Sequence, residues 1–233
     1  MNRLDVKPTR KGLGELAYES LRDSIVSMEL EPGQMVSEFE LASQLGVSRT
    51  PVREAFRLLM QEEFIDVMPQ RGARITLISQ RKVEETRFVR ECLEVRAFEE
   101  VAEQWDNSAD KYTRIERQIR LLFQEQEQAL QQNESFRFLQ LDEDFHRTVI
   151  ELCGNRTLLN VVTSMRGHLN RVRYLSLQEM GTMANLVREH EAILDAITKN
   201  DVHLVEEVLS HHLRRLTVEL PRIVELHKGY FTL

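Results

Sequence analysis

Four polar residues with metal-binding side chains lie on apolar helical stripes in the C-terminal two-thirds of the chain. Asp142 and His146 are spaced i, i+4 among apolar residues, and His190 and His212 share apolar stripes in two later segments. This spacing places side chains on one helix face. Neutral imidazoles and a carboxylate are the ligands of zinc and related divalent metals. The four residues are therefore candidate ligands converging inside a bundle, with a hydrogen-bonded polar core as the alternative.

A second group of residues is suited to DNA recognition. Ser48 and Thr50 flank the predicted start of a helix that Pro51 also favours, and Arg49 and Arg53 are four residues apart near its positive end. The hydroxyls can donate to phosphates, and the guanidinium groups can bind guanine edges or phosphate oxygens. We therefore predict that this helix enters the major groove. The alternative is that the arginines are ordinary surface charges.

The elements around that helix follow the order of a winged helix-turn-helix. An apolar stripe predicts a first helix over 13–28, and Ser37 opens a capping box before a short helix that Gly46 ends. Alternating residues over 64–67 and 73–77 predict the two strands of a wing.

The tip of the predicted wing carries Arg71 beside Gly72, where a long cation can enter a minor groove. We assign residues 1–11 to a basic arm and residues 12–78 to the DNA-binding domain. A helical domain is assigned to 79–229, which makes the protein mainly α. Its pattern shows no strand and predicts six helices, over about 80–105, 109–131, 135–153, 156–177, 183–199 and 201–227.

The composition is that of an ordinary globular protein, with 42% hydrophobic and 30% charged residues. No segment approaches the ~18 consecutive apolar residues of a membrane span. The charged N-terminus lacks an apolar leader, and Cys92 and Cys153 are far apart, so we expect a reduced, cytoplasmic protein without a membrane partner. The net charge of −7 weighs weakly against nucleic acid, but local basic clusters can still neutralise phosphates.

The helix-turn-helix resembles the GntR superfamily of bacterial regulators. The matching segments are Gly46-Val47-Ser48-Arg49-Thr50-Pro51-Val52-Arg53-Glu54-Ala55 and Pro69-Gln70-Arg71-Gly72, with Glu40-Leu41-Ala42 upstream. The resemblance implies a homodimer that reads a palindromic operator. The DNA contacts it implies are Ser48, Arg49, Thr50, Pro51, Arg53, Arg71 and Gly72. Phe39 stands where fatty-acid-regulator-like members often carry an arginine, so their operator is not carried over.

The helical domain is similar to the ligand-binding FCD domain of the FadR-type branch. The matching segments are Asp142–His146, Gly154-Asn155, Glu189–Ile197 and His212-Leu213. The resemblance implies that Asp142, His146, His190 and His212 bind a divalent metal, with zinc preferred over nickel or manganese. Six helices rather than seven favour the VanR-like subgroup.

The expected effector residues are Arg90, Glu94 and His168. Arg90 lies in a segment that lines the effector pocket of such domains, and its guanidinium could hold the carboxylate of an organic acid. A salt bridge to Glu94 is the alternative. His168 shares an inward stripe with Met165 and Leu169 and is a candidate for the pocket border.

These features together predict a bacterial transcription regulator, not an enzyme, that acts as a repressor controlled by a small carboxylate metabolite at the metal site. One alternative is a metal-dependent hydrolase with a DNA-tethering module, because an open metal position can activate water. Against it, the spacing of Glu143 and Glu189 predicts that both point off the inward face. Another is a constitutive DNA-architectural dimer with a structural metal.

Overall fold

The structure is a computed structural model that describes residues 12–68 and 72–232. The chain divides into two compact units between Leu77 and Ile78, one residue before the predicted boundary. Each unit has its own set of buried apolar side chains. The predicted basic arm over 1–11 and the wing-tip residue Arg71 lie outside the described residues.

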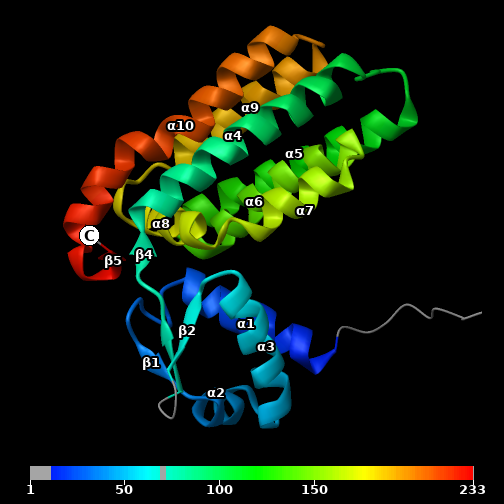
Figure 1. Ribbon diagram of the computed structural model, residues 1–233. Coiled ribbons are helices and arrows are strands. Elements are labelled where there is room, and N and C mark those ends of the chain that lie inside the picture. The colour runs from blue at the N-terminus through cyan, green and yellow to red at the C-terminus, as the bar shows by residue number, and fades with distance from the viewer. Residues whose placement is uncertain (1–11, 69–71, 233) are drawn as a thin grey trace, which may run out of the picture. The chain divides into compact units, whose positions relative to one another are not determined.

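The N-terminal unit combines helices with a small antiparallel sheet, which confirms the predicted winged helix-turn-helix (Figure 1). Its elements are α1 (Leu13–Val26), β1 (Met35–Val36), α2 (Glu38–Leu45), α3 (Arg49–Gln61), β2 (Ile65–Met68) and β3 (Gly72–Ile75). The strand order is β1-β3-β2, with Met35 opposite Arg74 and Ile65 opposite Ile75. Strand β1 was not predicted, because two residues are too few to show an alternation.

Helices α2 and α3 are placed by their ends and by one buried face. The Ser37 hydroxyl accepts from the Glu40 backbone N–H at 3.1 Å, which is the N-cap half of the predicted capping box, and it donates to the Glu40 carboxylate at 2.9 Å. Gly46 ends α2 in the left-handed region. Val52 and Ala55 of α3 are fully buried, so the opposite face of α3 carries the polar residues.

The C-terminal unit is a helical bundle with one short strand near each end. Its elements are β4 (Ile78–Ser79), α4 (Gln80–Glu103), α5 (Asp110–Gln132), α6 (Ser135–Cys153), α7 (Arg156–Ser164), α8 (Gly167–Glu179), α9 (Met183–Thr198), α10 (Val202–Leu226), η1 (Lys228–Tyr230) and β5 (Phe231–Thr232). The long helices α4, α5, α6 and α10 run alongside one another in Figure 1. Strands β4 and β5 pair in parallel, with Ile78 opposite Phe231, although no strand was predicted after residue 78.

The helix predicted over 156–177 is two helices, so residues 78–232 hold seven α-helices and the predicted count of six is wrong. The helix is interrupted at Met165 and Arg166, and Gly167 begins the next helix. The break turns Arg166 into the core, where its Nη2 lies 3.1 Å from Glu94 Oε1. The apolar stripe continues across the break, which explains the single predicted helix. The VanR-like assignment depended on that count, and seven helices do not support it.

Aromatic side chains fill the middle of the bundle and surround the candidate ligands. The ring of Phe145 lies edge-on to Phe98 and Phe123, with centroids 6.1 and 5.1 Å apart. The same ring lies 5.2 Å from His146 and 4.8 Å from His190. The two imidazoles are therefore held in apolar surroundings, where an unsatisfied polar atom costs free energy. None of the helices formed by the described residues is both long and apolar enough to span a bilayer.

Replacing Gly72 by alanine is expected to destabilise the N-terminal unit by about 2 kcal/mol or more. The backbone of Gly72 has a positive φ that disfavours a side chain, and the added Cβ would also clash with a neighbouring backbone atom. Gly72 has φ +95°, and an added Cβ would lie 2.4 Å from the Val36 carbonyl oxygen. Gly46→Ala is the matched control, since Gly46 has φ +65° with no atom within 4 Å of an added Cβ. Hydrogen exchange of the full chain, read in peptides from 12–68, should show faster exchange for Gly72→Ala. Equal exchange in the two variants would contradict this account.

Candidate functional site

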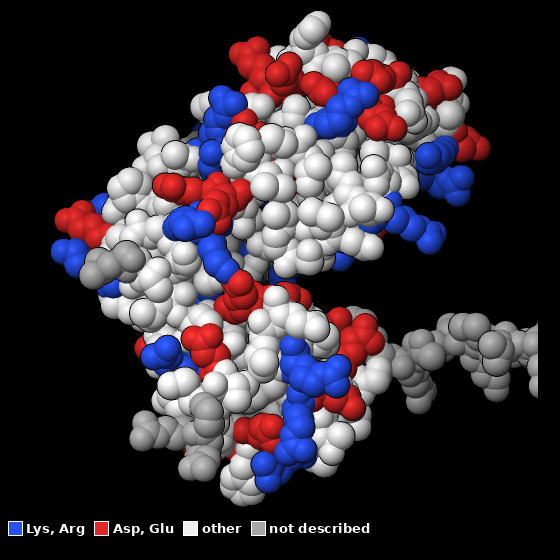
Figure 2. Space-filling model, viewed as in Figure 1, with Lys and Arg blue, Asp and Glu red and all other residues white. Residues whose placement is uncertain are grey.

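The start of α3 exposes the polar residues that were predicted to read DNA. Ser48 precedes the helix in an extended conformation, and its side chain makes no capping bond, so the hydroxyl is open to a partner. Arg49, Thr50 and Arg53 are exposed, whereas Pro51 is buried against the core of the unit. Figure 2 shows basic side chains interleaved with acidic ones on the visible face of this unit.

Both arginines that were predicted to read DNA contact one acidic residue of the preceding helix. Glu38 accepts from Arg49 Nη2 at 3.1 Å and from Arg53 Nε and Nη2 at 3.1 and 2.9 Å. The hydrogen bond from Arg53 is the largest influence on Glu38 and holds the pKa of its carboxyl below the ordinary value. This contact was not predicted, because the positions are distant in sequence and meet only when α2 packs on α3.

The four predicted metal ligands meet inside the C-terminal unit. One donor atom from each of Asp142, His146, His190 and His212 lies within 4.8 Å of the others, and all four residues are buried. His190 Nε2 lies 3.3 Å from Asp142 Oδ1, and His146 Nε2 lies 3.2 Å from His212 Nε2. Helices α6, α9 and α10 supply these residues, as their apolar stripes predicted.

Each of the three imidazoles has its other ring nitrogen next to an acceptor. His146 Nδ1 lies 2.7 Å from a Glu94 oxygen, His190 Nδ1 2.9 Å from Gln126 Oε1, and His212 Nδ1 2.9 Å from a Glu189 oxygen. Because carboxylate and amide oxygens only accept, each ring that carries a single proton can direct it from Nδ1 to this partner. The lone pair of each Nε2 then points toward the cluster. Metal-bound histidines have this arrangement of a second partner behind the ring.

The electrostatics of the cluster favour neutral imidazoles and an ionised carboxylate. Burial lowers the pKa of His146 to about 3 and that of His212 to about 4, so both rings are neutral at pH 7. Burial acts to raise the pKa of Asp142, but the positive charge around it, that of the Arg173 guanidinium first, outweighs burial and holds the pKa well below its ordinary value. Two neutral imidazoles and one ionised carboxylate thus lie in the cluster beside the ring of His190.

Facing acceptor atoms in this cluster need a positive group between them. Asp142 Oδ1 and His190 Nε2 are buried, and neither makes a hydrogen bond of good geometry within the described part of the chain. Two acceptors at such a distance repel each other unless a proton or a cation lies between them. The residues therefore fit a divalent cation with a mixed nitrogen and oxygen ligand set.

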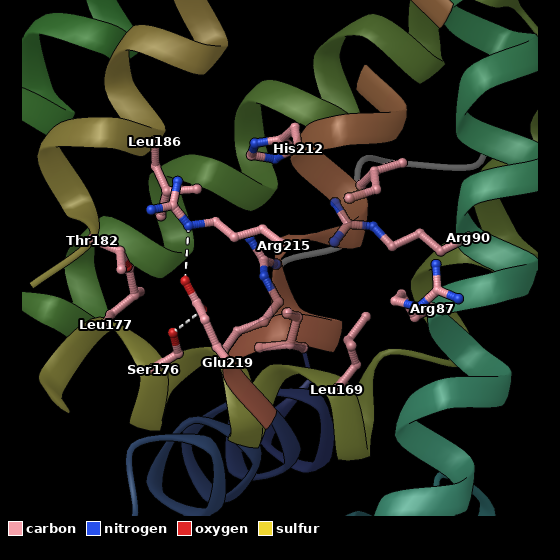
Figure 3. Close-up of a pocket in the computed structure, with 13 residues that line it drawn as sticks. Arg87, Arg90, Leu169, Ser176, Leu177, Thr182, Leu186, His212, Arg215 and Glu219 are labelled. Carbon is pink, nitrogen blue, oxygen red and sulfur yellow. Dashed lines mark hydrogen bonds and ion pairs between the residues drawn. The ribbon is translucent and has the colours of Figure 1, made fainter. Parts of the chain in front are cut away.

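A pocket adjoins this cluster, and its wall includes His212 (Figure 3). Four arginines contribute to the wall, namely Arg87, Arg90, Arg173 and Arg215, together with leucines of α8, α9 and α10. Figure 3 shows Arg87 and Arg90 on one helix, with Ser176, Leu177 and Thr182 across from them. Each of the four guanidinium groups already contacts a carboxylate, so a small organic anion in this pocket would share a guanidinium with an acidic side chain.

The three predicted effector residues occupy different places. Arg90 lines the pocket, but its Nε also lies 2.6 Å from Glu94, which is the predicted alternative salt bridge. Glu94 is fully buried behind His146 and is not part of the pocket wall. His168 is not on the wall either: its Nδ1 lies 3.3 Å from the Ser79 backbone nitrogen and 2.8 Å from Arg171 Nη2.

Three residues around the cluster were missed from the sequence. Gln126 falls in a segment that appeared to be a solvated helix face, yet it is fully buried beside His190. Glu189 was expected to point off the inward face, which is wrong, because it contacts His212. Arg173 donates to Asp142 Oδ2 and lines the pocket. Of these, only Gln126 left a signal, as a polar residue spaced three from Phe123 and Ala129.

Comparison with known proteins agrees with both halves of the chain. The model of the "Bacterial regulatory proteins, gntR family" matches residues 13–75, and that of the FCD domain matches residues 85–215. A protein of Streptomyces ambofaciens, described as an uncharacterized HTH-type transcriptional regulator in an unstable DNA locus, is 34% identical over 206 residues, covering 88% of this chain and 84% of its own. The HTH-type transcriptional repressor RspR of Escherichia coli K12 is 27% identical over 97% of this chain and 96% of its own.

The solved structure of E. coli McbR/YncC has the same fold, with a TM-score of 0.79 and 16% identity over 94% of this chain and 100% of that one. The matched family and the relatives are regulators rather than enzymes, which decides against the hydrolase alternative. The chain belongs to the gntR family of bacterial regulatory proteins, carries an FCD domain, and is a DNA-binding transcription regulator.

Proposed function

We propose that the protein is a dimeric repressor whose binding to a palindromic operator is controlled by a small carboxylate metabolite at a metal centre. The observation that supports this proposal is the convergence of Asp142, His146, His190 and His212, whose buried ligand atoms lie within 4.8 Å of one another. We choose repression as the direction of regulation because the E. coli relative RspR is described as a repressor. A dimer with two recognition helices matches two half-sites about one helical turn apart, or a multiple of it.

Zinc is the preferred metal, with nickel and manganese as alternatives. Neutral imidazoles and a carboxylate suit all three ions, and histidine nitrogens favour zinc or nickel over harder cations. When bound, the metal would supply a Lewis-acidic position for a carboxylate oxygen. Glu94, Gln126 and Glu189 orient the imidazoles, because each lies behind one ring.

The effector would occupy the pocket beside His212. Arg173 is suited to hold its anionic group, since its guanidinium reaches both Asp142 and the pocket wall. Arg215 of the pocket wall is already bound to Glu189 and Glu219, so its charge is offset there. Leucines of α8 and α10 leave room for a short aliphatic part. The effector class is therefore a small aliphatic organic acid.

Helix α8 offers a physical route from the pocket to the strand that follows the DNA-binding unit. Leu169, Arg173 and Ser176 of α8 line the pocket, while His168 of the same helix contacts the backbone of Ser79 in β4. An effector that shifts α8 would therefore act on β4. Such control requires different effector affinities for two arrangements of the dimer.

Substitution of His212 is expected to remove the metal. Protein purified without chelator should contain close to equimolar metal by mass spectrometry, and His212→Ala should lower the content by about ten-fold or more, because one ligand is lost. His211→Ala is the matched control, since His211 is the exposed neighbour of His212 on α10. His212→Gln, which fills more of the buried space, guards against loss by misfolding. Unchanged metal content in folded variants of His212 would contradict the metal centre.

Small carboxylates are expected to stabilise the metal-loaded protein and to change its affinity for operator DNA. A ligand at a hundred times its Kd adds about 2.7 kcal/mol of stability, which a thermal unfolding panel of aliphatic acids and their neutral amides would detect. Arg173→Gln should abolish the shift while the metal content is retained. An equal shift with the amides would contradict a carboxylate effector. If no acid changes DNA affinity, the metal is structural and the protein a constitutive architectural dimer.

A further inference from the structure

The contact between Glu38 and the two reading arginines bears directly on DNA recognition. The carboxylate belongs to the first residue of α2, and it bridges to Arg49 and Arg53 of α3. The arginine side chains remain 60% and 62% exposed while they make this contact. Exposed ion pairs contribute little to folding stability, so a purely structural role explains the arrangement poorly.

The geometry leaves one side of the Arg53 guanidinium free. A guanidinium can donate pairs of parallel hydrogen bonds from its Nε–Nη edge or from its Nη1–Nη2 edge. Glu38 occupies the Nε and Nη2 donors of Arg53, at 3.1 and 2.9 Å. The hydrogens of Nη1 and the second hydrogen of Nη2 then form the open edge. Recognition of guanine through O6 and N7 needs such a pair of donors.

Charge at this position has a second consequence. Arg49 and Arg53 carry two positive charges, and the ionised Glu38 beside them offsets one. Binding to DNA of any sequence depends on neutralising phosphates, so an offset charge weakens it. A fixed guanidinium loses less conformational freedom on meeting a guanine edge, so sequence-specific binding is favoured in comparison.

We propose that Glu38 is a positioning residue for DNA reading, which orients Arg53 and Arg49 toward base edges and suppresses binding through phosphates alone. Its effect is on the ratio of specific to non-specific affinity rather than on affinity itself. The inference depends on the α2–α3 contact and on DNA binding by the family, and it is independent of the metal and of the effector.

The test compares full-length wild type with Glu38→Gln on two probes. One is a duplex enriched by the wild-type protein from a random-sequence pool, and the other is a scrambled duplex of the same length and composition. Glu38→Gln should lower the ratio of the two affinities about ten-fold. Its binding to the scrambled duplex should strengthen, and the slope of log affinity against log salt concentration should become steeper by about one unit.

Two further variants separate this role from general charge effects. Glu40→Gln removes the same charge from the same helix and keeps the capping box, since glutamine can replace glutamate there; its affinity ratio should stay near that of wild type. Arg53→Lys keeps the charge but removes the planar edge of donors. It should therefore lower the ratio of specific to non-specific affinity without changing the dependence of affinity on salt concentration.

Equal effects of Glu38→Gln and Glu40→Gln on both probes would overturn the proposal, since the effect would then be one of overall charge. The proposal would also be overturned if Glu38→Gln lost discrimination at only a single base pair of the selected duplex, because Glu38 would then read that base itself. Thermal unfolding of each variant confirms that the comparison is made between folded proteins.

Discussion

The C-terminal unit depends on one unfavourable burial, that of the Asp142 carboxylate among three imidazoles. An ionised carboxylate in an apolar interior requires a positive partner. Arg173 supplies one on one oxygen, while the other oxygen faces His190. Glu94, Gln126 and Glu189 lie behind the rings, which is the arrangement that the proposed metal centre requires. A ligand in the pocket would then reach both the proposed metal and a guanidinium.

The N-terminal unit also has a carboxylate beside positively charged side chains, in this case at the surface. Arg49 and Arg53 must be exposed to meet DNA, yet two free guanidinium groups would bind any phosphate. Glu38 holds both without burying them. In each unit a carboxylate therefore contacts the side chains that we propose to bind the ligand. The acidic net charge of −7 is compatible with DNA binding because the reading surface is governed by local pairs.

Periodicity was sufficient to predict the groups that lie on a helix face. Asp142, His146, His190 and His212 could be found because each interrupts an apolar stripe with a polar residue, and such residues must converge in a bundle. The positions of Gln126, Glu189 and Arg173 could not be found in this way, since their contacts depend on how neighbouring helices are rotated and packed. The same limit applies to the hydrogen bonds that Glu38 accepts from the arginines of α3.

Short elements and breaks were also beyond the sequence patterns. Strands β1, β4 and β5 have two residues each, and their pairing is decided by the tertiary fold. The break between α7 and α8 is hidden because the apolar stripe continues through it. That break brings Arg166 to Glu94 and lets residues of α8 line the pocket.

X-ray absorption spectroscopy at the metal edge of the purified protein tests the central claim most directly. The account predicts a shell of nitrogen and oxygen atoms at about 2.0–2.2 Å with the outer-shell scattering of imidazole rings. Substitution of His190 should reduce that imidazole signal. A shell of sulfur atoms, or a bound metal without imidazole scattering, would contradict a centre formed by Asp142, His146, His190 and His212.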